Sequence, residues 1–212
     1  MIDTIIFDAD GVILDSEKLW DKGQEEFLKR RGFEYHRDKL KHLMTSTSPA
    51  EGVRVMQKHY GFTGDPELLA RERIEIVRSL FENELTLMEG FPDFFNSVKS
   101  THKTCIATSL DEDLLSIADR KLGLAGLFGP NIFTIAQVGH KGKPDPAIFL
   151  YAAQQLGSRP EQCLVIEDSP YGITAAKRAG MRCIGLATTY GQEMLTEADV
   201  VVQSFDQITI QN

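Results

Sequence analysis

The sequence has few cysteines, no long apolar run and no signal-peptide pattern. Its 212 residues include three cysteines, an odd number without C-x-x-C spacing. This argues against a disulfide framework or a cysteine metal site, and it is typical of proteins from a reducing compartment. No apolar stretch approaches the roughly 20 residues that span a bilayer. We therefore expect a cytoplasmic protein that has no membrane partner.

Positive charge is also scarce. Lysine and arginine together number 23, against 31 acidic residues, and the formal net charge is −8. Because binding to a nucleic-acid backbone needs a basic face, we expect no nucleic-acid partner. The first apolar run is followed by Asp-Ala-Asp-Gly rather than G-x-G-x-x-G, which disfavours a dinucleotide-binding oxidoreductase. A small anionic ligand is still compatible, since magnesium and one or two lysines can outweigh the global charge at short range.

The sequence does contain short apolar runs that alternate with helical patterns. The runs are nearly continuous in hydrophobicity, which is typical of strands covered on both faces of a parallel sheet. Ser109 with Glu112 indicates a capping box, and Asp145 and Ser169 each precede a proline suited to the first helical position. These patterns predict an α/β fold with a Rossmann-like parallel sheet. The expected strands are Thr4–Phe7, Thr104–Ala107, Ile132–Ile135, Cys163–Ile166, Cys183–Leu186 and Val200–Val202.

No convincing strand lies between Phe7 and Thr104. Helical patterns occupy this part of the chain, and Ser48-Pro49 and Asp65-Pro66 mark helix starts. We predict a catalytic core of residues 1–15 and 87–212, with a helical cap domain of residues 16–86 inserted after the first strand. The expected cap helices are Glu17–Arg31, Arg37–Met44, Pro49–Tyr60 and Pro66–Asn83.

Two aspartates follow the first expected strand directly. Asp8 and Asp10 stand one residue apart, and Gly11 then permits a sharp turn. In an open α/β sheet, ligands bind beyond the carboxyl ends of the strands. Carboxylates there suit a hard cation such as magnesium, and an aspartate can attack phosphorus covalently. Taken alone, a solvated turn would also explain the motif.

Three further motifs stand at comparable places. Thr108 and Ser109 combine a strand end with a helix start, where N–H groups bind anions, although Ser109 alone could be a helix cap. Lys143, unlike the nearby Lys141, adjoins a proline that can hold it in place to neutralise a phosphoryl group. Glu167-Asp168 ends another strand and could complete a cation site with Asp8, or only favour the next helix. If none of the four motifs were functional, a separate structural explanation would be needed for each of them. The combination of all four therefore favours a functional site.

In this order, the motifs resemble the haloacid dehalogenase superfamily, in its phosphatase and phosphomutase branch. The resemblance covers nearly the whole chain, and the combination is highly specific although each piece alone is not. It implies a magnesium-dependent phosphatase with a small helical cap, acting on a small phosphorylated metabolite such as a sugar phosphate. The matching segments are Asp8–Val12, Asp15–Glu17, Thr108-Ser109, Gly142–Pro146 and Glu167–Ser169.

The resemblance also implies how phosphate would be transferred. Asp8 would attack the phosphorus and become an aspartyl-phosphate. Asp10 would protonate the leaving oxygen and then activate water; dehalogenases of the superfamily would not be expected to carry it. Thr108 and the N–H of Ser109 would hold the phosphoryl oxygens, and Lys143 would stabilise Asp8 and the transferring group.

Magnesium is the cofactor that the resemblance implies. Its ligands would be Asp8, Asp168 and the backbone carbonyl of Asp10. Glu167 would lie just outside the ion or serve as an alternative ligand. A non-enzymatic binding module is disfavoured, because such a protein would be expected to lose Asp8, Asp10 or Lys143.

The cap departs from the pattern of β-phosphoglucomutase, which uses a cap histidine and a basic loop. Trp20 stands at the histidine's place, and residues 44–49 contain no lysine or arginine. A mutase must hold a second phosphate, so we expect simple hydrolysis, with phosphomutase as the alternative. Trp20, Thr45 and Ser46 are candidate substrate contacts; Trp20 could equally be a core residue, and the other two an exposed loop. We expect a monomer or a weak dimer.

Overall fold

The chain folds into two compact units. The computed structural model describes residues 1–45 and 47–210. One unit comprises Met1–Asp15 together with the chain from Thr86 onward, and the other comprises Ser16–Leu85. No helix in the described part of the chain is both long and apolar enough to cross a lipid bilayer.

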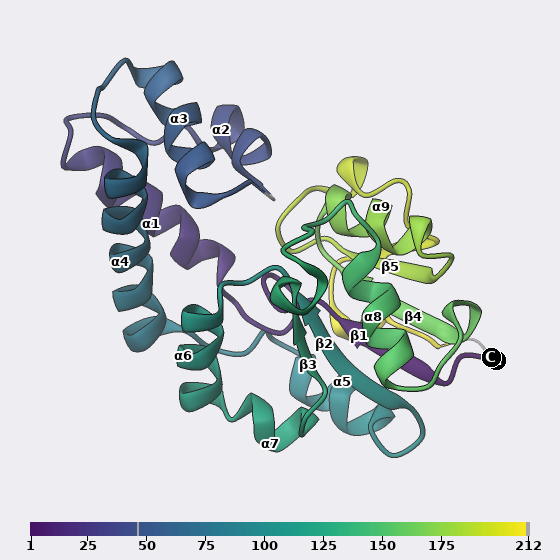
Figure 1. Cartoon of the computed structure of the whole chain (residues 1–212). Coiled ribbons are helices and arrows are strands. Elements are labelled where there is room, and N and C mark those ends of the chain that lie inside the picture. The colour runs from purple at the N-terminus through teal and green to yellow at the C-terminus, as the bar shows by residue number, and fades with distance from the viewer. Residues whose placement is uncertain (46, 211–212) are drawn as a thin grey trace. The chain divides into compact units, whose positions relative to one another are not determined.

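The first unit is built on a six-stranded parallel sheet, in the order β3-β2-β1-β4-β5-β6 (Figure 1). All four residues of β1 are buried, as expected for a strand covered on both faces. Six parallel strands with a helical insertion between β1 and β2 confirm the α/β fold. The strands are β1 Thr4–Phe7, β2 Lys103–Thr108, β3 Ile132–Thr134, β4 Cys163–Glu167, β5 Arg182–Leu186 and β6 Val200–Val202.

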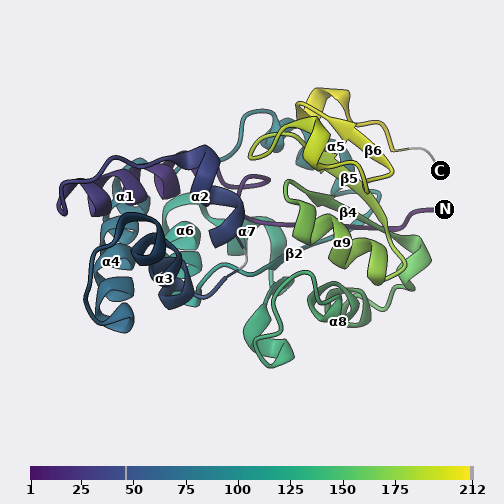
Figure 2. The same cartoon turned by 90° about the horizontal axis from the view of Figure 1, so that it is seen from above.

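Helices cover both faces of this sheet, as Figures 1 and 2 show. Side chains of a strand alternate between faces. Ile6 therefore packs with α8 (Ala147–Gln155) and α9 (Pro170–Arg178) in one apolar cluster. Phe7, on the other face, makes edge contacts with four phenylalanine rings of α5 and α7 at centroid distances of 5.7 to 6.3 Å. The remaining elements of the unit are α5 Phe91–Val98, α6 Glu112–Leu122, α7 Leu124–Phe128 and short 3-10 turns at Ile135–Val138, Pro160–Gln162, Gln192–Met194 and Phe205–Gln207.

The second unit consists of helices. Its apolar cluster includes Phe27, Val53 and Met56. Ser48 and Asp65 cap their helices as predicted, because each side chain accepts a first-turn N–H and a proline follows. The helices are α1 Glu17–Lys29, α2 Arg37–Met44, α3 Pro49–Tyr60 and α4 Pro66–Glu84.

The capping box predicted at Ser109 is wrong. Helix α6 begins at Glu112, and the carboxylate of Asp111 accepts the N–H of Asp113 at 2.9 Å. Because Asp111 caps the helix, the Ser109 hydroxyl is left buried and has no hydrogen-bond partner in the described structure. Ser169 does cap α9, by accepting the N–H of Gly172 at 3.1 Å.

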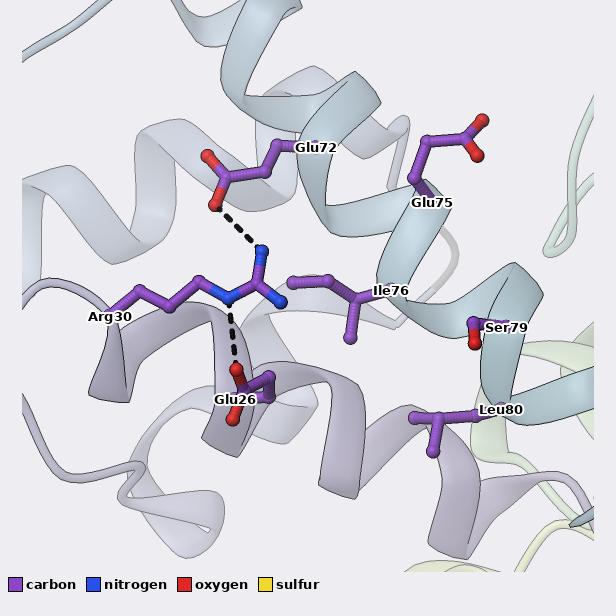
Figure 3. A pocket seen from close by; sticks show the side chains of 7 residues that line it. All are labelled: Glu26, Arg30, Glu72, Glu75, Ile76, Ser79 and Leu80. Carbon is purple, nitrogen blue, oxygen red and sulfur yellow. Dashed lines mark hydrogen bonds and ion pairs between the residues drawn. The ribbon is translucent and has the colours of Figure 1, made fainter.

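An open hollow of about 570 Å³ lies on the helical unit between α1 and α4 (Figure 3). Its arginine, Arg30, bonds the carboxylate of Glu26 at 2.9 Å and pairs with Glu72 at 3.6 Å. Since two carboxylates already neutralise this guanidinium, the hollow is not an anion site, and we assign it no role.

Arg73 of α4 is a second, very different arginine. Its side chain is only 6% exposed, and its Nε and Nη1 atoms have no hydrogen-bond partner among the described residues. It approaches α3 so closely that a Cβ added to Gly52 would lie 2.8 Å from Nη1. Burial lowers the pKa of this guanidinium to about 10. A buried charge without a partner destabilises the folded state.

We therefore predict that Arg73→Met increases the free energy of unfolding by about 1–3 kcal/mol, since it removes unsatisfied buried donors. Urea denaturation of the parent and the variant measures the difference. Arg54→Met is the matched control, because Arg54 is an exposed arginine of the same unit. A less stable Arg73→Met would show that the guanidinium is satisfied in solution.

Candidate active site

The candidate site lies where β1, β2 and β4 end. β1 is central, and Phe7 pairs in register with Ile106 of β2 and Ile166 of β4. The residues that follow are therefore neighbours at one edge of the sheet. Asp8, Thr108 and Glu167 are all buried there.

Lys143 joins two of these strand ends. It lies in the segment that leads into α8, and its side chain is buried, whereas Lys141 is exposed. The ammonium donates to Oδ1 of Asp8 and to Oε1 of Glu167, the latter at 2.6 Å. Its nitrogen also lies 5.0 Å from the ring centroid of Phe149. The sequence prediction that Lys143 is held in place agrees with this geometry.

Burial and neighbouring charges set the ionisation of this pair. Burial raises the pKa of the Asp8 carboxyl to about 7; Lys143 opposes the shift, whereas Glu167 and Asp10 add to it. Burial alone would lower the pKa of the Lys143 ammonium, but Asp8 and Glu167 raise it above its ordinary value. The lysine therefore stays positively charged, and the ionisation of Asp8 near neutral pH is sensitive to an added cation.

Glu167 is fully engaged by its surroundings. Its Oε2 accepts the N–H groups of Asp168 and Ser169 and the Ser169 hydroxyl, each at 2.9 Å. Gly172 permits this arrangement, because a Cβ at that position would lie 1.7 Å from Oε1 of Glu167. With Oε1 bound to Lys143, the carboxylate is fixed as the partner of the lysine.

Three carboxylates gather at the edge of the sheet. Among the described residues, Asp8, Glu167 and Asp168 each offer an oxygen within 4.8 Å of the others. Three carboxylates against the one ammonium of Lys143 leave two uncompensated negative charges. An all-oxygen donor set with this excess charge fits a hard divalent cation. The carboxylate of Asp10 is not part of the group, although its charge acts on Asp8.

The two hydroxyl residues predicted to hold phosphate lie after the neighbouring strand. Thr108 accepts the N–H of Leu110 at 3.0 Å, which leaves its hydroxyl proton for another acceptor. The buried Ser109 hydroxyl has no partner among the described residues. Both residues therefore keep hydrogen-bonding capacity at the edge that Asp8 occupies.

The candidate substrate contacts in the insertion have local partners. Trp20 is half-buried, and its ring lies 6.1 Å from that of Phe81, edge to face. The hydroxyl of Thr45 donates to the carbonyl of Lys41 at 2.9 Å. Ser46 lies outside the described residues. Contact with substrate stays a prediction for all three.

Sequence reasoning missed Thr189, whose hydroxyl donates to Oδ2 of Asp168. It also missed Gly172 and the buried Arg73. A hydroxyl just after an apolar run was the signal available for Thr189, and it is the same signal that identified Thr108. The strand order was needed to show that β5 ends beside β4.

The family model for haloacid dehalogenase-like hydrolases matches residues 2–180. The fructose-1-phosphate phosphatase of Escherichia coli (strain K12) is 33% identical over 183 residues, which are 85% of this chain and 94% of that protein.

Solved structures agree with the sequence comparison. CbbY of Rhodobacter sphaeroides, in complex with xylulose 1,5-bisphosphate, has a TM-score of 0.81 and 25% identity, covering 98% of this chain and 96% of that one. β-Phosphoglucomutase of Clostridium difficile has a TM-score of 0.79 and 26% identity, covering 99% and 94%. The chain therefore belongs to the haloacid dehalogenase-like hydrolases and is an enzyme of their phosphatase and β-phosphoglucomutase branch, with a helical cap.

Proposed function

We propose that the protein is a magnesium-dependent phosphatase that hydrolyses a small phosphate monoester, a sugar phosphate, through an aspartyl-phosphate on Asp8. The observation that carries this proposal is the buried contact of Asp8 with the Lys143 ammonium, beside Glu167 and Asp168. The 33% identity to a fructose-1-phosphate phosphatase supports a sugar phosphate as substrate.

Asp8, Asp168 and the backbone carbonyl of Asp10 would hold the magnesium ion. The carboxylate cluster and its excess negative charge support this choice. Glu167 is assigned to the lysine instead, because four donors already occupy its two oxygens. When bound, magnesium supplies positive charge against the phosphoryl oxygens and keeps Asp8 ionised.

The proposed reaction has two steps, transfer of the phosphoryl group to Asp8 and hydrolysis of the aspartyl-phosphate. A carboxylate oxygen of Asp8 attacks phosphorus as the bond from phosphorus to the leaving oxygen breaks, and Asp10 gives that oxygen a proton. Asp10 then takes a proton from water, whose oxygen attacks the phosphorus and releases phosphate from Asp8. Lys143 and the hydroxyls of Thr108 and Ser109 neutralise and orient the phosphoryl group throughout.

A phosphomutase is the second candidate, and Arg73 is the observation that favours it. The absence of basic residues from 44–49 counts against a second phosphate site. Arg73 is a cation of the cap outside residues 44–49, and its Nε and Nη1 donors have no hydrogen-bond partner in the described structure. The test is whether the protein converts β-glucose 1-phosphate in the presence of a bisphosphate activator. If the parent does so and Arg73→Met does not, the protein is a phosphomutase rather than a phosphatase.

We predict magnesium-dependent phosphate release from a panel of sugar phosphates and other small monoesters. Asp8→Asn should reduce release to background, because no nucleophile remains. Asp10→Asn should lower the rate by about 10²–10⁴-fold, the usual contribution of general acid–base catalysis. Asp93→Asn, a change at an exposed carboxylate of α5 that has no role in the proposed reaction, should leave the rate unchanged. Full activity of Asp8→Asn would exclude the proposed intermediate.

We also predict that magnesium stabilises the protein more at pH 8 than at pH 5.5. Without metal, folding raises the pKa of Asp8 from 3.8 to about 7, so folded-state stability falls as pH rises through this window. Magnesium must displace the proton, so its apparent affinity should drop about tenfold for each pH unit below 7.

Melting temperatures with and without magnesium at the two pH values measure this effect. Asp8→Asn is the control, and it should show little magnesium-induced stabilisation at either pH. An equal shift in the parent at both pH values would contradict the role of Asp8 as a ligand.

A further inference from the structure

The segment after β5 contacts both Asp168 and the loop that follows Asp8. β5 lies beside β4, with Glu167 paired in register with Gly185, so both strands end at the edge of the sheet that carries the site. Thr188 and Thr189 are the second and third residues after the end of β5. Thr189 is buried, with 7% of its surface exposed. Its hydroxyl is therefore placed within the protein rather than in solvent.

Thr189 contacts one member of the carboxylate cluster formed by Asp8, Glu167 and Asp168. Its hydroxyl donates a hydrogen bond to Oδ2 of Asp168. A carboxylate that accepts a hydrogen bond on one oxygen is restrained in its rotation, and groups that restrain metal ligands in this way set metal affinity. Among the three carboxylates of the cluster, Glu167 is restrained by the start of α9, whereas Asp168 is restrained by Thr189 of the segment that follows β5.

Thr188 ties the same segment to the loop of the nucleophile. Its hydroxyl donates to the carbonyl of Gly11 at 2.5 Å. Gly11 has a φ of +71°, and a Cβ there would lie 1.9 Å from Oδ2 of Asp168 and 2.6 Å from the Thr189 hydroxyl oxygen. The backbone of the loop after β1 therefore packs directly against the Thr189–Asp168 pair. This contact leaves Asp168 little room to turn away.

We propose that Thr189 is a positioning residue of the magnesium site, which holds the Asp168 carboxylate in the orientation that faces Asp8. The inference rests on the proposed function for the identity of the cation. Thr189 sets the affinity for magnesium and takes no part in the transfer of phosphate. Loss of its hydroxyl removes one restraint on the Asp168 carboxylate, so binding of the ion must then restrict more of its rotation.

Isothermal titration calorimetry of magnesium into the substrate-free protein tests this inference. Thr189→Val keeps the shape of the side chain but removes the donor, and we expect magnesium to bind about 10- to 100-fold more weakly. Thr189→Ser keeps the donor and should bind with the parent's affinity. Thr174→Val is the matched control, because its hydroxyl bonds Glu197 on the surface, and it should not change affinity.

Two further measurements separate positioning from folding and from chemistry. Melting curves without magnesium should show Thr189→Val folded, with Thr189→Ala as a second variant, and kcat at saturating magnesium should stay near that of the parent. Parent-like magnesium affinity in Thr189→Val, or equal loss in Thr189→Ser, would overturn the inference. A parent that binds no magnesium overturns it together with the proposed cofactor, whereas a parent that binds magnesium but releases no phosphate overturns only the proposed reaction.

Discussion

The site depends on one buried ammonium group. Lys143 donates to Asp8 and Glu167, and all three side chains are almost fully buried. Taking each ion out of water costs several kcal/mol, and removing the central cation would leave two carboxylates facing each other without compensation. The three side chains come from separate parts of the chain: Asp8 and Glu167 stand at the ends of β1 and β4, and Lys143 lies in the segment that leads into α8.

The surrounding fold supplies what that interaction needs. β1 and β4 are adjacent parallel strands, so Asp8 and Glu167 leave the sheet side by side. The start of α9 then saturates the second oxygen of Glu167, and Gly172 gives the carboxylate room to sit against the helix. The lysine neutralises only part of the charge, since Asp168 and Asp10 add further carboxylates. This excess supports the proposed divalent cation. The pKa of Asp8 rises to about 7 chiefly because the carboxyl is buried, and the charges of Glu167 and Asp10 add to the shift.

Much of this arrangement was predictable, because parallel strands bring their carboxyl ends to one edge. Asp8, Thr108 and Asp168 each follow an apolar run, so the rule finds them from the sequence. The start of α6 was missed because Ser109 and Asp111 are both good caps, and sequence alone does not decide between them. Thr189 was missed because its place beside Asp168 depends on the order of β4 and β5.

Arg73 was missed for another reason. It stands in a helix rich in charged residues, where an arginine normally faces solvent, and only the structure shows it buried. Substrate contact by Trp20, Thr45 and Ser46 stays a prediction, because the strand-end rule does not apply to residues outside the sheet.

In the proposed mechanism, Asp8 carries the phosphoryl group during turnover. The most direct measurement is acid quenching of the enzyme during turnover with magnesium and a hydrolysed sugar phosphate, followed by mass spectrometry of its peptides. We expect one added phosphoryl group on the peptide that contains Asp8, and this group should disappear once substrate is exhausted. Steady turnover with no phosphoryl group on that peptide, or with the group on another residue, would contradict it.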